Sequence, residues 1–174
     1  EYENTFVNAR GERRVITWRA APVIGPDGQV ESIVAGGIDI TDRQLLEEEK
    51  EREREFLNAI ANEAPSLLCL IDATGRVEPN ATNKAFEAAL EYAPADTGGH
   101  LFWERYVDPG DAEEVRALLQ AAIAGEQIGE HDHRWVTSTG RLLTVAWTCT
   151  PLPRVDERTV FLISGVDVTE RKRR

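Results

Sequence analysis

The chain has 174 residues, with 31 acidic and 20 basic side chains and a net charge of −11 at pH 7. Nucleic acids and anionic membrane surfaces attract clustered cations. No Lys/Arg cluster occurs before the last four residues, so neither is expected as a partner. The apolar runs are shorter than the roughly 20 residues that span a bilayer, and no signal segment opens the chain. We therefore expect a cytoplasmic segment without membrane contact.

Residues 1–44 are predicted to form three consecutive strands. In the middle strand Ile16, Trp18 and Ala20 alternate with polar residues, which is the period of a strand with one covered face. The turn GPDG at 25–28 separates this strand from the third, SIVAGGIDI. The pattern predicts an antiparallel meander.

A linker helix is predicted over residues 45–63. Just before it, Thr41 and Gln44 have the spacing of a capping box. In such a box the hydroxyl accepts a hydrogen bond from a free helix N–H, and the Gln side chain reaches back to the cap residue.

Residues at alternating four- and three-residue steps form a seam along this helix. They are Leu46, Lys50, Glu53, Leu57, Ile60 and Ala64. The seam is apolar at its ends and charged in the middle, and polar residues at such positions lower the stability of a coiled coil. Two interpretations stay open: a single solvated helix with Glu–Arg pairs, or a weakly stable parallel two-helix seam through Leu46, Leu57 and Ile60 in a homodimer.

Residues 64–130 are predicted to form two strands and then helices. The strands are LLCLID and GRVEP, and NKAFEAAL places Phe86, Ala89 and Leu90 at helical spacing. After DPGD, a longer helix has an apolar stripe with helical periodicity, made of Val115, Leu118, Leu119, Ala122 and Ile123. Asp108 or Asp111 is expected to cap this helix, and Gly125 to end it.

The last part of the chain repeats the first. HDHRWVTS, a turn at Thr139-Gly140, an alternating strand through Trp147 and Cys149, and RTVFLISGVDV predict three more strands. Trp18 corresponds to Trp147, and GIDITDRQ at 37–44 corresponds to GVDVTERK at 165–172. The repeat predicts two sheets of the same kind, each followed by a helix.

These segments resemble a PAS domain, an α+β fold with a five-stranded antiparallel sheet and helices on one face. The resemblance rests on LIDATGRV with Asn83–Phe86 after it, on the DPGD helix, on the strand–Gly–strand at 131–150, and on the closing PAC-type motif G-[IV]-D-[IV]-T-[DE]-R. It implies an intact PAS domain over 64–170, with 171–174 starting the next linker helix. Residues 1–44 resemble only the last three strands of a preceding, truncated PAS domain, so we expect a fragment of a longer protein.

The resemblance implies a non-catalytic sensory and signal-relay module. Asp39, Thr41, Asp167 and Thr169 would relay the signal through the two exits. The implied output domain lies in the same polypeptide outside this chain: a histidine kinase of a two-component system, a cyclic-dinucleotide enzyme such as a diguanylate cyclase, or a transcription regulator. The alternative is a ligand-free homodimerisation module.

A ligand of a PAS domain lies between the inner sheet face and the helices. The residues that the resemblance places there are Phe86, Leu90, Phe102, Trp103, Tyr106, Leu118, Leu119, Trp135, Trp147, Cys149, Phe161 and Ile163. Side chains at these periodicities also form ordinary hydrophobic cores, and this second interpretation stays open. The ligand itself is unknown.

Haem and covalent flavin are not expected as cofactors. Haem-binding relatives use an axial ligand, typically a His on the long helix; this helix has none and the chain has no Met, which leaves His100 before the helix as the one candidate. Covalent flavin needs a reactive Cys in an Asn-Cys-Arg helix, but Cys69 and Cys149 lie in predicted strands.

No metal site and no catalytic residue are predicted. His131 and His133 share a strand face with Trp135, and His-x-His is a metal half-site, but no third ligand lies nearby in the sequence. A metal- or redox-dependent enzyme using these histidines is a third interpretation. No nucleophile elbow, phosphate loop or kinase signature occurs.

Overall fold

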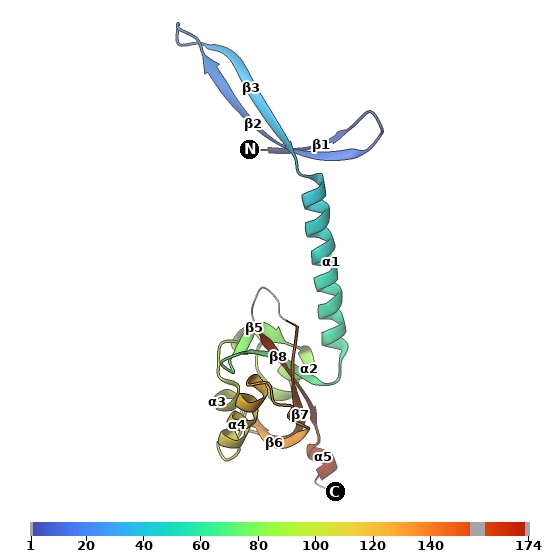
Figure 1. Cartoon of the computed structure of the whole chain (residues 1–174), viewed down its shortest axis with the longest axis vertical. Coiled ribbons are helices and arrows are strands. Elements are labelled where there is room, and N and C mark those ends of the chain that lie inside the picture. The colour runs from blue at the N-terminus through green and yellow to red at the C-terminus, as the bar shows by residue number, and fades with distance from the viewer. Residues whose placement is uncertain (1, 154–158, 173–174) are drawn as a thin grey trace. The chain divides into compact units, whose positions relative to one another are not determined.

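The computed structural model describes residues 2–153 and 159–172 (Figure 1). The chain consists of two compact units, Glu1–Phe56 and Leu57–Arg174, which are described separately here. Residues 173–174, at the start of the predicted next linker helix, lie outside the described residues.

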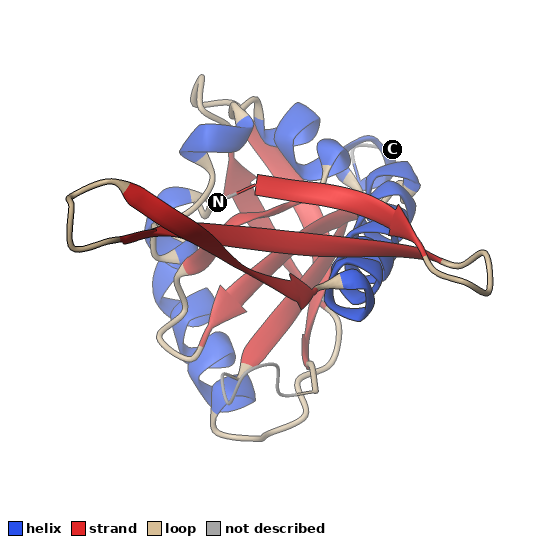
Figure 2. Cartoon of the chain, turned by 90° about the horizontal axis from the view of Figure 1, so that it is seen from above, coloured by secondary structure: helices blue, strands red, loops and turns tan. Residues whose placement is uncertain are grey.

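The first unit contains a three-stranded antiparallel sheet. Its strands are β1 (Tyr2–Val7), β2 (Arg13–Ile24) and β3 (Val30–Asp39), in the order β1-β2-β3. The two connecting turns lie at opposite ends of the sheet (Figure 2). Each contains a glycine with positive φ, Gly11 and Gly28, a conformation that side chains with a Cβ disfavour. The predicted three-strand meander is confirmed.

Large apolar side chains of this sheet are exposed. Tyr2, Phe6 and Ile33 have exposed fractions of 56%, 44% and 68%. Trp18 is only half-buried, and its ring lies 5.7 Å from that of Phe6. Tyr2, Phe6 and Ile33 of this sheet are therefore largely open to solvent.

The helix α1 (Thr41–Glu63) begins four residues before the predicted linker start. None of its residues is buried, and Leu46, Leu57 and Ile60 are all more than half exposed. Its surface carries three Glu–Arg pairs at helical spacing, Arg43–Glu47, Arg52–Glu48 and Arg54–Glu51. Such exposed pairs contribute little to stability.

The second unit is an α+β domain with a five-stranded antiparallel sheet, as predicted. Its strands are β4 (Leu67–Asp72), β5 (Val77–Thr82), β6 (His131–Val136), β7 (Leu142–Pro151) and β8 (Val160–Asp167), in the order β5-β4-β8-β7-β6. Its helices are α2 (Lys84–Leu90), the short 3-10 helix η1 (Pro94–Asp96), α3 (Phe102–Arg105), α4 (Ala112–Ile123) and α5 (Thr169–Lys172).

One face of this sheet is buried. Along β4 and β7 every second side chain is buried, and α2, α3 and α4 add Phe86, Phe102 and Leu119 to the same core. In the predicted stripe of α4, Val115, Leu119 and Ala122 are buried and Leu118 and Ile123 are partly buried. The helical stripe and the strand alternation therefore meet in a single core.

The sequence repeat is also a repeat of strand register. Trp18 pairs with Gly37 in the first sheet, and Trp147 pairs with Gly165 in the second. The two sheets differ at the free side of their third repeated strand, β3 in the first sheet and β8 in the second. β8 has β4 on its other side, with Cys69 opposite Ile163, whereas β3 is an edge strand.

The cap predicted for α4 is wrong. Asp111 occupies the cap position, but its side chain makes no capping bond. Its carboxylate instead accepts hydrogen bonds from the backbone N and the guanidinium of Arg134, at 2.8–3.1 Å, and Asp108 pairs with the same guanidinium at 2.8 Å. The Arg134 hydrogen bonds lower the pKa of Asp111 to about 2. The helix ends as predicted, with Gly125 at φ +99°.

Gly165→Ala tests the close packing under β8. A Cβ at this position would lie 2.7 Å from Val145 Cγ1 and 3.2 Å from the Trp135 ring. Overpacking of this kind costs about 1–3 kcal/mol, so we expect urea unfolding to show a clear loss of stability. The matched control is Gly129→Ala, which meets no atom within 4 Å. Equal unfolding midpoints for the two variants would contradict the packing.

Candidate functional site

A hydroxyl group makes two hydrogen bonds at the junction of β8 and α5, where the Val168 N–H also donates to the Thr144 carbonyl at 2.8 Å. Thr169 Oγ1 donates to Asp167 Oδ1 and accepts a hydrogen bond from the Thr144 backbone N–H at 2.8 Å. The Thr169 N–H donates to the same Asp167 oxygen at 2.9 Å. This arrangement, which we call the exit clamp, joins the end of β8, the start of α5 and the neighbouring strand β7.

The first unit has the same exit clamp. Thr41 donates to Asp39 from its hydroxyl at 2.6 Å and from its N–H at 2.9 Å, and its hydroxyl accepts from the Val15 N–H at 2.8 Å. The hydroxyl bond is the main reason that the pKa of Asp39 is lowered. The four residues predicted as relay residues thus form two equivalent pairs.

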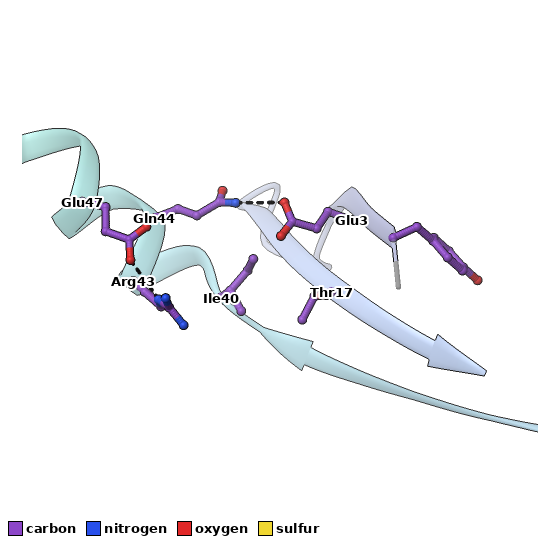
Figure 3. A pocket seen from close by; sticks show the side chains of 7 residues that line it. Glu3, Thr17, Ile40, Arg43, Gln44 and Glu47 are labelled. Atoms are coloured by element: carbon purple, nitrogen blue, oxygen red, sulfur yellow. Dashed lines mark hydrogen bonds and ion pairs between the residues drawn. The ribbon is translucent and has the colours of Figure 1, made fainter. Parts of the chain in front are cut away.

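The predicted capping box at Thr41 and Gln44 is wrong. The Thr41 hydroxyl binds a strand rather than a helix N–H, and the Gln44 amide donates to Glu3 on β1 at 3.2 Å (Figure 3). In the second unit Lys172, which matches Gln44, pairs with Asp132, which matches Glu3. The first turn of each exit helix therefore contacts the outermost strand of its own sheet.

A hollow of about 560 Å³ lies at the first exit. It is lined by Tyr2, Glu3, Thr17, Ile40, Arg43, Gln44 and Glu47 (Figure 3). Its charged groups contact one another, as in the 2.9 Å pair of Arg43 with Glu47. Gln44, which donates to Glu3, and Arg43, which pairs with Glu47, lie in the first turn of α1, so these polar side chains stabilise the strand–helix junction.

The end of α1 from Leu57 onward belongs to the second unit and is held to the rest of that unit by Asn83. This side chain is only 3% exposed. Its Oδ1 accepts from the N–H groups of Leu68 and Phe86, both at 3.0 Å, and its Nδ2 donates to the carbonyls of Ala61 and Ser66 at 2.8 and 2.9 Å. One amide thus joins α1, the start of β4 and the first turn of α2.

A second bond reinforces this entry point. Asn62 Oδ1 accepts from the Lys84 N–H at 3.0 Å. The sequence analysis quoted Asn83 only as part of a motif and did not assign it a role. An Asn directly before a helical pattern is a good capping signal, but the partners at Ala61 and Ser66 depend on the tertiary fold.

The predicted pocket residues meet in the hydrophobic core. All are buried there except Leu118, which is partly buried. Their rings contact one another: Phe102 lies 5.1 Å from Trp135, and Phe86 lies 5.2 Å from Tyr106. Ring centroids this close are those of directly packed aromatic pairs, so these side chains fill the space between sheet and helices.

Two of these residues reach a cleft at the edge of the domain. Cys149 and Phe161 line a cleft of about 600 Å³ between the end of α4 and the paired ends of β7 and β8. Burial raises the pKa of the Cys149 thiol to about 11, so the thiol is protonated at neutral pH. Cys69 is fully buried, and desolvation raises its pKa further. Neither cysteine is activated for chemistry.

The histidines of β6 form a hydrogen-bonded aromatic group. Trp147 Nε1 donates to His133 Nδ1 at 3.0 Å, and His131 lies 6.2 Å from the His133 ring. His131, His133 and Trp135 share a face, as predicted. Within the described part of the chain, no three His, Cys, Asp or Glu side chains are placed to hold a metal ion.

These features define a small α+β domain entered through one helix and left through an Asp-x-Thr strand–helix junction. Residues 61–173 match a family model described as PAS fold. The chain therefore belongs to the PAS family, as the sequence resemblance implied.

Solved structures agree with this assignment at the level of the fold. The PAS domain of an HTR-like protein from Haloarcula marismortui has a TM-score of 0.58 at 22% identity, covering 71% of this chain and 98% of its own. A PAS domain from a two-component sensor histidine kinase has a TM-score of 0.56 at 15% identity, covering 68% and 98%. The RpfR quorum-sensing receptor PAS domain from Cronobacter turicensis, in complex with C12:0, has a TM-score of 0.51 at 19% identity, covering 62% and 97%.

A comparison with curated protein sequences found no match. No described helix is long and apolar enough to cross a membrane.

Asn83→Asp tests the tie between α1 and the domain. The variant keeps both acceptor bonds but places carboxylate oxygens against the Ala61 and Ser66 carbonyls. We expect faster amide hydrogen exchange in residues 57–63 and a loss of about 2 kcal/mol in the free energy of unfolding. Asn62→Asp is the matched control, because it keeps its acceptor for the Lys84 N–H. Unchanged exchange in Asn83→Asp would show that the tie contributes little.

Proposed function

We propose that the second unit is a non-catalytic sensory and signal-relay PAS module of a multidomain signalling protein. A small ligand or a protein partner changes the state of the domain, and the exit clamp passes this change to the helix that follows Asp167. The proposal places the receiving output domain in the same polypeptide, outside this chain, and the whole segment in the cytoplasm.

The duplicated exit clamp is the observation that carries the proposal. Asp39 with Thr41 and Asp167 with Thr169 make the same three bonds in two units that differ in most other respects. Each clamp lies at the point where a strand becomes a helix. A shift between two neighbouring strands would therefore change the geometry at the helix start.

The energetic demand on such a relay is modest. A ligand shifts a two-state equilibrium only by its difference in affinity for the two states, typically 1–3 kcal/mol in allosteric coupling. A side-chain hydrogen bond contributes about 1 kcal/mol. Making or breaking one clamp bond is thus comparable to the free energy that a ligand supplies.

The domain architecture follows from the same repeat. We propose that residues 1–44 are the last three strands of another PAS domain, that 45–63 are a signalling helix, and that 64–170 are the intact domain. The type of output domain is not selected by any residue described here. A histidine kinase agrees with the origin of one of the similar structures, and a cyclic-dinucleotide enzyme or a transcription regulator fits the same helical exit.

The second candidate function is a ligand-free homodimerisation module. It is favoured by the exposed apolar side chains of α1, including Phe56, Leu57 and Ile60. It is also favoured by the direct contacts among the core aromatic rings, such as Phe86 with Tyr106 and Phe102 with Trp135. In this case the seam along α1 would hold two copies together without any ligand.

Thr169→Val tests the relay, because it removes the hydroxyl and keeps the side-chain shape. We expect the domain to stay folded, with the Thr144 amide exchanging at least tenfold faster. Ile163→Val removes one methylene group from a core side chain of β8 and should alter hydrogen exchange at the Val168 and Lys172 amides. In the double variant, Thr169→Val should abolish this response.

The control for this cycle is Thr150→Val at an exposed position of β7. If Thr169→Val unfolds the whole domain, the clamp is only structural. If the response to Ile163→Val survives in the double variant, the signal does not pass through Thr169.

Leu57→Cys tests the homodimer seam. Two parallel helices packed through this position should form a disulfide-linked dimer under mild oxidation, and the native cysteines are buried and free. Glu55→Cys, on the opposite face of α1, is the matched control and should stay monomeric. Monomer for both variants on non-reducing gels would reject the seam.

A further inference from the structure

His133 is a buried histidine on the inner face of β6, with an exposed fraction of 6%. Its Nδ1 accepts a hydrogen bond from Trp147 Nε1 at 3.0 Å, and its Nε2 lies 3.5 Å from Glu114 Oε1 in the first turn of α4. Because an indole N–H can only donate, Nδ1 carries no proton in this arrangement. The ring is therefore the neutral tautomer with its proton on Nε2, bound to β7 on one side and facing α4 on the other.

We infer that His133 is a proton-binding site through which the second unit responds to pH. A proton from solvent takes the Nδ1 lone pair that now accepts from Trp147. The hydrogen bond to β7 is lost, and an ion pair between His133 and Glu114 on α4 takes its place. The inference rests on the proposed sensory function and names the proton as the small ligand.

The chemistry of the ring makes the two states exclusive. Histidine is the side chain whose charge ordinarily changes between about pH 5 and 8. The charged ring has an N–H on both nitrogens and no acceptor, so its Nδ1–H would point at the N–H of Trp147. Trp147 is fully buried, and a buried donor that has lost its partner costs free energy. The two rings must therefore separate when His133 is protonated.

The charges on the helix side attract a protonated His133. Glu114 presents a carboxylate to Nε2, and Asp111, directly before α4, is also close. The pKa of Asp111 is lowered chiefly by its hydrogen bonds with Arg134 and to a smaller extent by the charge of His133. Movement toward α4 thus brings the charged ring closer to anions.

The strand side offers the charged ring no such attraction. β7 presents Trp147, which does not titrate, and β6 places His131 at 6.2 Å between ring centroids. A charge on His131 would oppose one on His133. Asp132 alternates to the other face of β6, where it pairs with Lys172. Protonation therefore favours α4 over β7.

The repeat indicates that the sheet forms without this indole bond. Trp147 matches Trp18, and His133 matches Asn4. Trp18 pairs with its glycine in the same register as Trp147 does, although its Nε1 has no hydrogen-bond partner among the described residues. Loss of the bond between His133 and Trp147 is therefore compatible with an intact strand ladder.

Trp147 also lies close to the exit clamp. It pairs with Gly165 of β8, and two residues further along the ladder Val145 pairs with Asp167. A Cβ at Gly165 would lie 3.6 Å from the Trp147 Cβ, so Trp147 packs closely against the backbone of β8. A movement of its ring would reach β8 just before the clamp.

The test follows the Trp147 indole N–H of the full chain by NMR between about pH 7.5 and about pH 5.5. We expect its resonance to move on acidification with the same midpoint as the His133 ring resonances, because both report one proton. His133→Asn keeps an acceptor near the position of Nδ1 but takes no proton, so its Trp147 resonance should stay constant. His131→Asn is the matched control and should keep the native response.

Amide exchange in the same samples reports whether the proton acts at the exit. At about pH 5.5 the Thr144 amide should exchange about fivefold faster in the native chain than in His133→Asn, and at about pH 7.5 the two rates should agree. Comparing the two chains at one pH cancels the intrinsic pH dependence of amide exchange.

A second variant tests the ion pair. Glu114→Gln should move the midpoint of the Trp147 response to lower pH, because the charged ring loses its anionic partner. Glu113→Gln, which removes a carboxylate paired with Arg116, is the matched control. An unchanged midpoint in Glu114→Gln would overturn the ion pair. A Trp147 resonance that stays constant in the folded native chain, or that titrates equally in folded His133→Asn, would overturn the proton site.

The Ile163→Val variant separates this inference from the proposed function. If the Trp147 resonance does not follow His133 while Ile163→Val still alters exchange at Val168 and Lys172, the proton site is wrong and the relay stands. If Trp147 follows His133 but neither protonation, judged against His133→Asn, nor Ile163→Val alters that exchange, the relay is wrong and the proton site stands.

Discussion

At each of the two strand–helix junctions of this chain, a threonine hydroxyl both donates and accepts a hydrogen bond. A hydroxyl can donate one hydrogen bond and accept others. Thr169 uses this capacity to donate to Asp167 within its own turn and to accept from Thr144 on the next strand. A carboxylate or an amine at this position could not do both. The hydroxyl therefore adds a second link between the start of the helix and β7, beside the hydrogen bond from the Val168 N–H to the Thr144 carbonyl.

The two units show how the same half-sheet behaves with and without a covering layer. In the second unit the strands β6, β7 and β8 are covered by helices and extended by β4, and Trp147 is fully buried. In the first unit the equivalent Trp18 is only half-buried, and Ile33, which matches the buried Phe161, is 68% exposed. The local sequence is enough to specify the strand register. The segments that cover the sheet decide how much apolar surface is buried, and therefore how much the sheet contributes to the free energy of folding.

Features that depend on periodicity could be predicted from the sequence. Alternation along β7 and the stripe of α4 identified the core residues, and the matched positions of Trp18 and Trp147 identified the repeat. These patterns work because burial follows the geometry of a single element. The fold class followed from the order of such elements together with the closing motif.

The hydrogen-bond partners of polar side chains were harder to predict, because these partners lie far away in the sequence. Thr41, Asp111 and Asn83 all stand at helix starts, where a local cap is the default expectation. Asn83 does cap α2, but it also binds Ala61 and Ser66, while Asp111 binds Arg134 and Thr41 binds Val15. A side chain with several lone pairs can bind different partners, and only the tertiary fold brings those partners close. The direct contacts among the core rings likewise depend on the tertiary fold and could not be predicted from the sequence.

The filled interior also constrains how any signal travels. The ladder between β7 and β8 joins two whole strands through backbone hydrogen bonds, and inward side chains of these strands, such as Trp147 and Ile163, belong to the packed core. From Phe161 to Asp167 this ladder contains seven residue pairs and extends about 20 Å at the usual rise of a strand. A perturbation at the cleft end would therefore reach the clamp end through the backbone hydrogen bonds and the inner side chains of both strands. The entry tie at Asn83 binds Leu68 of β4, which pairs with Ser164 of β8, so α1 is connected to a strand of the same ladder.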